Sequence, residues 1–274
     1  MTLKSFKTSK PIIGMLHIGN LLGTKGFKGV NRLVANAKKD IRALQAGGID
    51  GILIENWKED SIGEFVSTET AVSFSIIAQE LVKHIKVPFG FNILNNDYKL
   101  ALSLAALIKA DFVQLDVFVD NVVSDFKYSE ISSKNPFKIY PDPAKVKGYA
   151  KLVGIPNIPI FAFIQPKHYK LLEKNKPIEK SAKQAKKAGA SALLVTKETG
   201  FAPTKELLKK AKEGAKSIPV GIGSGFSSKN AKEYLKVVDF AIVGTSIKKN
   251  GITDNPVDEG KVRELMSIVK KSRS

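Results

Sequence analysis

The sequence of 274 residues predicts an α/β protein with one domain, 1–274, folded as a (β/α)8 or TIM barrel. Two observations predict this fold. Eight short, near-continuous apolar segments are typical of parallel strands covered on both faces, and a helical pattern follows each of them. The segments begin alternately on proline and on Asp or Ser, near Pro11, Asp50, Pro88, Asp111, Pro159, Ser191, Pro219 and Asp239.

The strand and helix signals are consistent with this alternation. Proline is tolerated at the first residue of a strand, even inside a sheet. Periodic apolar residues predict helices over 30–46, 70–85, 98–109, 143–152, 178–188, 205–215, 228–236 and 257–269. The connection 120–141 is longer than an ordinary loop and rich in Asn, Ser and aromatic residues. We expect it to be a lid, a contact within a homo-oligomer, or a disordered loop.

Composition narrows the classes of function. The chain is 43% hydrophobic, enough for one large core, and it contains no cysteine, which excludes disulfides, thiolate catalysis and cysteine-bound zinc. No apolar run approaches the roughly 20 residues of a membrane span, so we expect no transmembrane segment and a cytoplasmic location. No cofactor is expected. A divalent cation would have to use carboxylates or the three histidines, and no close acidic cluster favours one.

The charge balance favours an anionic partner. Lys and Arg number 44 against 26 Asp and Glu, a net charge of +18. Such a surface attracts phosphorylated metabolites, nucleic acids or acidic membranes. The lysines recur through the predicted helices without interleaved aromatic residues, so most of them are expected to lie on solvated helix faces. We therefore expect no specific nucleic-acid site.

Polar residues cluster where the predicted strands end, the edge at which barrel enzymes carry their active sites. Glu55 ends an apolar strand, where burial would raise its pKa and suit it to general acid or base chemistry, with Asp116 as its partner. The alternative is a carboxylate held by a neighbouring lysine. The full set of candidate catalytic and ligand-binding residues at the first five strand ends is His17, Glu55, Asn92, Asp116, Lys167 and His168.

The two histidines and Lys167 have simpler alternatives. His17 and His168 are placed to relay protons or bind phosphate, whereas a lone histidine is more often a hydrogen-bonded structural residue. Lys167 and His168 together suggest loop cations that face an anion, although exposed lysines are common elsewhere in this chain.

The last two predicted strands end in a pattern typical of phosphate binding. Each ends on glycine followed by a hydroxyl residue, in Gly223-Ser224-Gly225 and Gly244-Thr245-Ser246. Glycine lets an anion approach the backbone N–H groups, Ser and Thr add donors, and the N-terminus of a following helix adds a favourable dipole. Barrels of this type often bind phosphate after strands seven and eight. The alternative is that the glycines merely turn the chain from strand to helix.

Lys197 follows the sixth predicted strand, where a lysine of lowered pKa could form a Schiff base. The surrounding segment resembles that of deoxyribose-phosphate aldolases, with the lysine displaced by one position. In a strand, one position is the opposite face. An exposed loop lysine paired with Glu198 is the simpler interpretation.

Taken together, several motifs resemble the BtpA/SgcQ family over about 11–266. They are Pro11-Ile-Ile-Gly-Met-Leu-His17, 48–56, Pro88-Phe-Gly-Phe-Asn92, Lys167-His168 and 222–258 with its Gly-Ser-Gly and Val-Gly-Thr-Ser-Ile-Lys segments. The resemblance implies a TIM barrel of the ribulose-phosphate-binding type, in a family named partly for photosystem I biogenesis and partly for an association with sugar-uptake genes. The chain departs from the family pattern at Asn95, Gln114, Phe163 and Lys197.

These observations lead to two expectations of function. The first is an enzyme, a lyase, isomerase or hydrolase, that acts on a small phosphorylated metabolite such as a sugar or nucleotide phosphate. The second is a non-catalytic assembly factor that keeps the barrel and its anion site. The retained residues Glu55 and Asn92 favour the first, and the departures at Asn95, Gln114 and Phe163 favour the second.

Overall fold

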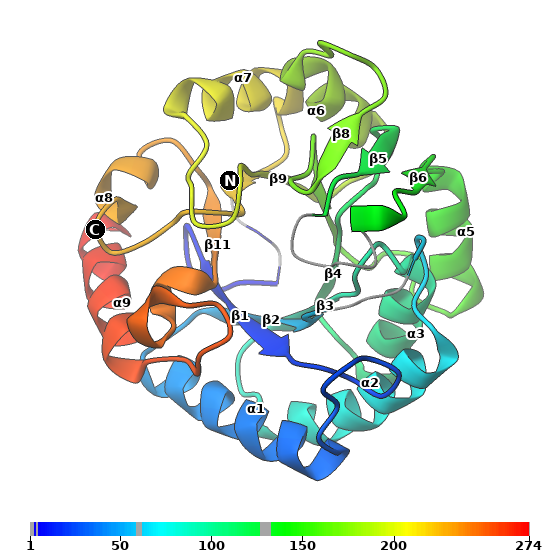
Figure 1. Cartoon of the computed structure of the whole chain (residues 1–274). Helices are drawn as coiled ribbons and strands as arrows, with labels where there is room; N and C mark the ends of the chain where they lie inside the picture. Colours follow the sequence, from blue (N-terminus) through cyan, green and yellow to red (C-terminus); the bar gives the residue numbers. More distant parts are fainter. Residues whose placement is uncertain (1–2, 4, 59–61, 127–132, 274) are drawn as a thin grey trace.

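A computed structural model describes residues 3, 5–58, 62–126 and 133–273, and within them eight parallel strands close into a barrel (Figure 1). Around the barrel the strands follow one another in chain order, and the last pairs with the first. This confirms the predicted fold, and each strand begins one residue after its expected start. The strands are β1 (Ile12–Ile18), β2 (Gly51–Asn56), β3 (Phe89–Asn92), β4 (Phe112–Leu115), β7 (Ile160–Phe163), β9 (Ala192–Val195), β10 (Val220–Ile222) and β11 (Phe240–Val243).

Helices surround the barrel in the order the sequence predicts, and several begin at a side-chain cap such as Ser67, Asp97 or Thr204. They are α1 (Val30–Ala46), α2 (Thr68–Leu81) continued by η1 (Val82–His84), α3 (Tyr98–Ile108), α5 (Pro143–Leu152), α6 (Ile178–Lys187), α7 (Lys205–Ala215), α8 (Ala231–Tyr234) and α9 (Glu259–Arg273). Two short turns, η2 (Thr245–Ile247) and η3 (Lys249–Gly251), follow β11.

Two helix predictions need correction. The helix expected over 228–236 is reduced to α8, because Asn230 caps a turn: its Oδ1 accepts from the Ser227 N–H at 2.9 Å. The helix expected over 257–269 begins at Glu259, since Val257 pairs with Lys248 in an isolated β-bridge, and it continues to Arg273.

Aromatic rings fill the barrel interior near the amino ends of the strands, so a cavity can open only at the carboxyl ends. The rings of Phe112 and Phe161 stack with centroids 4.5 Å apart, and Phe240 packs beside them at 5.4 Å from Phe161. Glycines make room for these rings: a Cβ at Gly90 or Gly221 would lie 2.5 Å from Phe112 or Phe240, respectively.

Side chains alternate between the interior and the helical layer, as the two-residue period of a strand requires. Phe112 on β4 packs inside the barrel, so Gln114 and Asp116 follow on the same side. Leu53 likewise precedes Glu55 on β2. The interior pattern of the strands therefore brings these polar residues to the mouth of the barrel.

Parts of the connections after β4 and after β7 form a second, small sheet beside the barrel mouth. Three short antiparallel strands occur in the order β6 (Lys138–Ile139), β5 (Val122–Ser124), β8 (Tyr169–Leu171). A buried ion pair between Asp120 Oδ1 and Lys176 Nζ, 2.6 Å apart, joins the connection after β4 to the segment between β8 and α6. The described part of 120–141 is thus ordered, and 127–132 lies outside the described residues. Its role in a homo-oligomer stays a prediction.

Across the part of the chain that the structure describes, no helix is both long enough and apolar enough to cross a membrane.

Candidate active site at the carboxyl ends of the barrel strands

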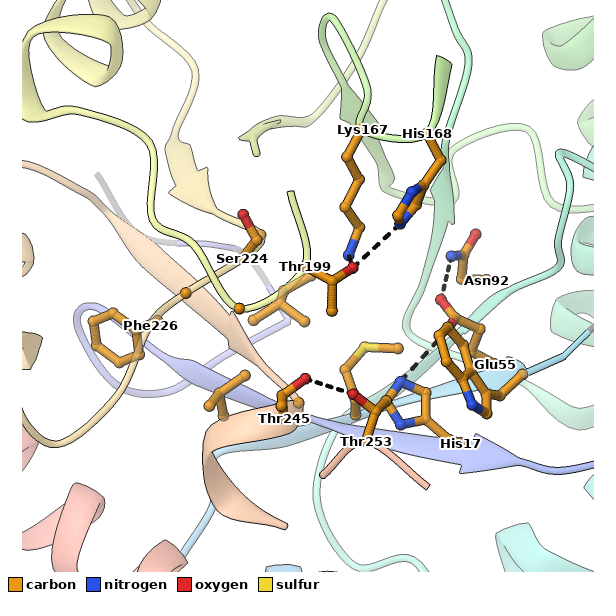
Figure 2. A pocket seen from close by; sticks show the side chains of 18 of the residues that line it. His17, Glu55, Asn92, Lys167, His168, Thr199, Ser224, Phe226, Thr245 and Thr253 are labelled. Atoms are coloured by element: carbon orange, nitrogen blue, oxygen red, sulfur yellow. Dashed lines mark hydrogen bonds and ion pairs between the residues drawn. The ribbon is translucent and has the colours of Figure 1, made fainter. Parts of the chain in front are cut away.

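A cavity of about 340 Å³ opens at the carboxyl ends of the strands (Figure 2). All twelve candidate residues from the sequence line it, and their roles stay predictions. The sequence did not single out several other lining residues as candidates: Met15, Leu94, Gln114, Phe126, Phe163, Pro166, Tyr169, Thr199, Phe226 and Thr253.

One wall of the cavity carries two carboxyl groups that share a donor. The side-chain nitrogen of Asn92 donates to Glu55 Oε2 at 2.7 Å and to Asp116 Oδ1 at 3.2 Å. Gln114 Nε2 donates to the same Asp116 oxygen at 3.3 Å. Glu55 and Asp116 therefore face the cavity without any lysine within ion-pair distance among the described residues, which disfavours the ion-paired alternative for Glu55.

Burial raises the pKa of Glu55 to about 7, and the negative charge of Asp116 raises it further against the opposing effects of Lys167 and Asn92. Burial also raises the pKa of Asp116 to about 6, although Lys167 and the two amide donors stabilise its charged form. Both carboxyl groups consequently titrate close to neutrality, where a side chain transfers protons in either direction.

His17 stands next to Glu55 at the end of β1. Its Nε2 lies 3.6 Å from Glu55 Oε1, and its ring packs against Trp57 with centroids 5.2 Å apart. Burial first, and then the positive charges of Lys248 and Lys167, hold the pKa of His17 well below its usual value. His17 is therefore neutral at neutral pH, and in that form one ring nitrogen accepts while the other donates.

Lys167 and His168 project from the loop after β7 toward Thr199 (Figure 2). Lys167 Nζ lies 3.4 Å and His168 Nε2 3.2 Å from the Thr199 hydroxyl. Burial lowers the pKa of Lys167, while the charges of Glu55 and Asp116 across the cavity raise it.

Three buried polar atoms of residues that line this cavity have no hydrogen-bond partner among the described residues: Asn92 Oδ1, Gln114 Oε1 and His17 Nδ1. Asn92 and Gln114 are only 1% and 2% exposed. Buried polar atoms without partners cost free energy, so this wall of the cavity is not optimised for stability.

The turns after β10 (Gly223-Ser224-Gly225) and β11 (Gly244-Thr245-Ser246) form the opposite side of the cavity. The serine hydroxyl groups in these turns do not have the role that the sequence predicted. The hydroxyl groups of Ser224 and Ser246 donate to the carbonyls of Phe201 at 2.9 Å and Phe226 at 2.7 Å, so they do not add donors for an anion. The Gly223 N–H is also used, since it donates to Val195 at 2.9 Å.

Two of these glycines leave space that neighbouring residues of the chain occupy. A Cβ at Gly223 would lie 2.5 Å from the Phe163 ring, and one at Gly225 would lie 2.1 Å from the Ala202 nitrogen. Gly225 also has a φ of 67°, which favours glycine. Close packing within the chain thus accounts for glycine at these two positions.

Backbone donors nevertheless remain at both turns. Within the described part of the chain, no intramolecular acceptor is present for the N–H groups of Ser224, Gly225, Phe226, Gly244, Thr245 and Ser246. Asn230 fixes the first turn, because its Nδ2 donates to the Gly225 carbonyl at 2.8 Å while its Oδ1 accepts from Ser227. The α8 helix has only four residues, so the helix dipole that we expected there contributes little.

Lys197 lies outside the cavity. Its side chain is exposed, and only its backbone N–H contacts a lining residue, donating to Ser224 Oγ at 2.9 Å. Leu194 on β9 packs inside the barrel. Lys197 comes three residues later, and because side chains alternate between the two faces of a strand, this odd spacing directs Lys197 away from the barrel interior. This geometry gives no support to the aldolase alternative based on Lys197.

Of the residues that sequence reasoning missed, Gln114 carried a usable signal. It precedes Asp116 by two positions and therefore shares its face of the strand. Phe126 and Tyr169 carried none, because they reach the cavity from the small sheet, where their rings lie 5.2 Å apart. Asn95 does not line the cavity: its side chain donates to the Gly63 carbonyl at 3.0 Å.

The described residues contain no group of three or more His, Asp or Glu side chains arranged to hold a metal ion.

Comparison with known proteins identifies the family. The family model described as BtpA matches residues 8–271. The chain belongs to the BtpA family. Among its relatives, an uncharacterised protein of Archaeoglobus fulgidus is 32% identical over 263 residues, covering 95% of this chain and 99% of that protein. The photosystem I biogenesis protein BtpA of Synechocystis is 24% identical over 269 residues, covering 97% and 90%.

Solved structures show the same fold. The native KDPGal structure superposes on this BtpA-family barrel with a TM-score of 0.57 at 14% identity, covering 98% of each chain. Phosphoribosyl anthranilate isomerase from Thermus thermophilus gives 0.54 at 12% identity, covering 95% of this chain and 98% of that enzyme. At these identities the similarity establishes the TIM barrel alone.

Proposed function

We propose that this BtpA-family barrel is an enzyme that binds a small sugar phosphate and transfers protons to or from its carbon skeleton. The observation that carries the proposal is that the two sides of the cavity at the carboxyl ends of the strands offer different chemistry. Backbone N–H groups without partners line one side, at Gly225 and Thr245, and the carboxyl pair Glu55 and Asp116 lies on the other.

On the phosphate-binding side of the cavity, most hydrogen-bond donors would be backbone N–H groups. An anion seated between the turns after β10 and β11 would receive hydrogen bonds from N–H groups that otherwise lack acceptors. The bond from Ser246 Oγ to the Phe226 carbonyl, 2.7 Å long, ties the two turns into one concave surface. Lys167 and His168 lie on the neighbouring wall of the same cavity.

The other end suits acid–base chemistry. A carboxyl group with a pKa of about 7, as Glu55 has, can donate or accept a proton at physiological pH. The cavity of about 340 Å³ lies at the small end of ligand sites, which favours a sugar phosphate over a nucleotide. An isomerase, lyase or hydrolase reaction is compatible with this arrangement.

The test compares each phosphorylated sugar with its unphosphorylated counterpart by thermal shift. Ligand bound only to the native state at a hundred times its Kd stabilises by about 2.7 kcal/mol, so ribose 5-phosphate or fructose 6-phosphate should raise Tm while ribose and fructose do not. Mass spectrometry of a phosphometabolite mixture incubated with wild type, and with Glu55→Gln as the inactive control, identifies the reaction. Equal shifts for both members of every pair contradict the proposal.

A second candidate, a non-catalytic assembly factor, is favoured by the name of the Synechocystis relative and by Phe163, a departure from the family pattern that lines the cavity. The same experiment separates the two functions. Stabilisation by phosphorylated sugars without any change in the metabolite mixture supports the assembly role, and turnover that Glu55→Gln abolishes supports the enzyme.

A further inference from the structure

Lys167, whose side chain is partly buried, differs from Lys176 and Lys248, the buried lysines of the described residues. Lys176 Nζ lies 2.6 Å from Asp120, and Lys248 Nζ lies 3.1 Å from Asp40, so both have carboxylate partners. Lys167 faces the cavity and has only the Thr199 hydroxyl, 3.4 Å away, as a polar partner among the described residues. An ammonium group that is partly withdrawn from water without a carboxylate partner is costly, which shifts it toward its neutral form.

The groups across the cavity from Lys167 are the two carboxyl groups. Neither Glu55 nor Asp116 comes within the 4.0 Å of an ion pair with Lys167 Nζ, yet their charges raise its pKa against the effect of burial. The amine and the two carboxyl groups all line the same cavity, and Figure 2 shows Lys167 and Glu55 on different sides of it. A carbonyl group of a bound substrate fits that arrangement chemically, since its carbon takes the amine and its oxygen takes a proton.

We propose that Lys167 forms a Schiff base with the carbonyl carbon of a phosphorylated aldehyde or ketone, a substrate class that deepens and rests on the function proposed above. The neutral Nζ attacks the carbonyl carbon, and the carbonyl oxygen takes a proton from Glu55. The attached nitrogen then gives one proton to the Asp116 carboxylate, which leaves a neutral carbinolamine.

The second half of the step releases water. Asp116 returns its proton to the carbinolamine hydroxyl, which leaves as water while the nitrogen lone pair forms the C=N bond. The products are a protonated imine, water and two carboxylates, so the reaction needs no other reactant. The cationic imine faces both carboxylates, which stabilise it. This step assigns to Lys167 the role that the sequence suggested for Lys197.

Reductive trapping tests the assignment. The protein is mixed at neutral pH with limiting glyceraldehyde 3-phosphate or, in parallel, with pyridoxal 5′-phosphate, reduced with borohydride, and mapped by peptide mass spectrometry. We expect the stable secondary amine at Lys167 ahead of every other lysine, with inorganic phosphate slowing its formation. The adduct at that peptide is lost in Lys167→Arg and kept in Lys197→Arg, the matched control at an exposed lysine outside the cavity.

The outcomes separate this inference from the proposed function. Labelling of Lys197 or other exposed lysines ahead of Lys167, with both probes on wild-type protein, overturns the Schiff base whether or not the variants fold. If phosphorylated sugars still raise Tm in that case, the proposed function stands without it. If no phosphorylated sugar raises Tm and no adduct forms at Lys167, both fail.

Discussion

The side-chain nitrogen of Asn92 lies 2.7 Å from Glu55 Oε2, and the same nitrogen reaches Asp116 Oδ1 at 3.2 Å. One neutral amide is thus shared between two carboxyl groups, and it cannot neutralise either. Their protons come off as those of a coupled pair, whose apparent pKa values belong to both residues. Burial of both carboxyl groups, which the shared amide only partly offsets, is the physical basis of the pH dependence predicted next.

Glu55→Gln is expected to change how stability depends on pH. In wild type, the native pKa of Glu55 is about 7 against 4.5 for the unfolded chain, so between these values the native state binds more protons and stability falls as pH rises. The loss is at most about 3.5 kcal/mol, at about 1.4 kcal/mol per pKa unit. Asp116 contributes in the same direction, and the positive charge of Lys167 opposes it.

Urea unfolding at several pH values from about 4.5 to 7.5 measures this dependence. The Glu55→Gln variant should lose much of the downward slope and exceed wild type in stability at the upper end. Glu198→Gln, at an exposed position outside the cavity, should keep the wild-type profile. A Glu55→Gln variant with an unchanged slope would show that Glu55 titrates as it does in the unfolded chain.

Gln114→Met is expected to weaken ligand binding while changing the stability of the unliganded protein little. The change removes a buried oxygen that has no partner but also the 3.3 Å bond from Gln114 Nε2 to Asp116, so the stability of the unliganded protein should change by less than about 1 kcal/mol. The Tm rise produced by a phosphorylated sugar should shrink, because Gln114 lines the cavity and its amide holds the Asp116 carboxyl group. Gln165→Met is the matched control: its amide donates to the Lys176 carbonyl at 2.8 Å, and its loss should destabilise by about 1–3 kcal/mol.

Thermal unfolding measured with and without a phosphorylated sugar tests both variants. Destabilisation of Gln114→Met comparable to that of Gln165→Met would mean that the Gln114 amide serves the fold rather than a ligand.

Much of the barrel follows from local sequence. Strands such as β7 and β11 begin one residue after Pro159 and Asp239, since a short apolar run between polar neighbours is enough to define a buried strand. The mouth of the barrel follows as well, because a two-residue period carries polar residues such as Glu55 and Asp116 to the same edge. This is why the candidate residues could be gathered from sequence alone.

The remaining features depend on contacts between residues distant in sequence. Ser224 looks like a phosphate donor until its hydroxyl is seen to donate to Phe201. The helix expected from 228 is shortened by the Asn230 side chain, which holds the preceding turn. The neighbour that fills the space beside Gly225 is Ala202, more than twenty positions away. No pattern within one segment reveals such partners.

Asn230→Ala is expected to weaken phosphate binding with a modest cost in stability. The variant loses two hydrogen bonds, to the Ser227 N–H and the Gly225 carbonyl, that hold the turn in which backbone donors face the cavity. Each such bond contributes about 0.5–1.5 kcal/mol. Asn255→Ala, which loses one exposed bond to the Lys249 carbonyl at 3.0 Å, is the control outside the cavity.

Titration with inorganic phosphate, followed by thermal shift, measures the effect. Saturation at a higher concentration in Asn230→Ala than in Asn255→Ala supports a phosphate site at the turn after β10. Identical curves for the two variants would place any bound phosphate elsewhere.

The net charge of +18 is expected to produce only weak, salt-sensitive binding to nucleic acids. Lysines lie on the outer helices, for example Lys186 and Lys187 in the last turn of α6 and Lys270 and Lys271 in that of α9, where they are spread around the barrel. A binding mode built only from lysine–phosphate contacts loses affinity steeply with salt because it depends on counterion release. Fluorescence anisotropy with single-stranded and duplex oligonucleotides should therefore show binding at low salt and none at about 0.15 M. Tight retention of one sequence over others at the higher salt concentration would instead reveal a specific nucleic-acid site on this surface.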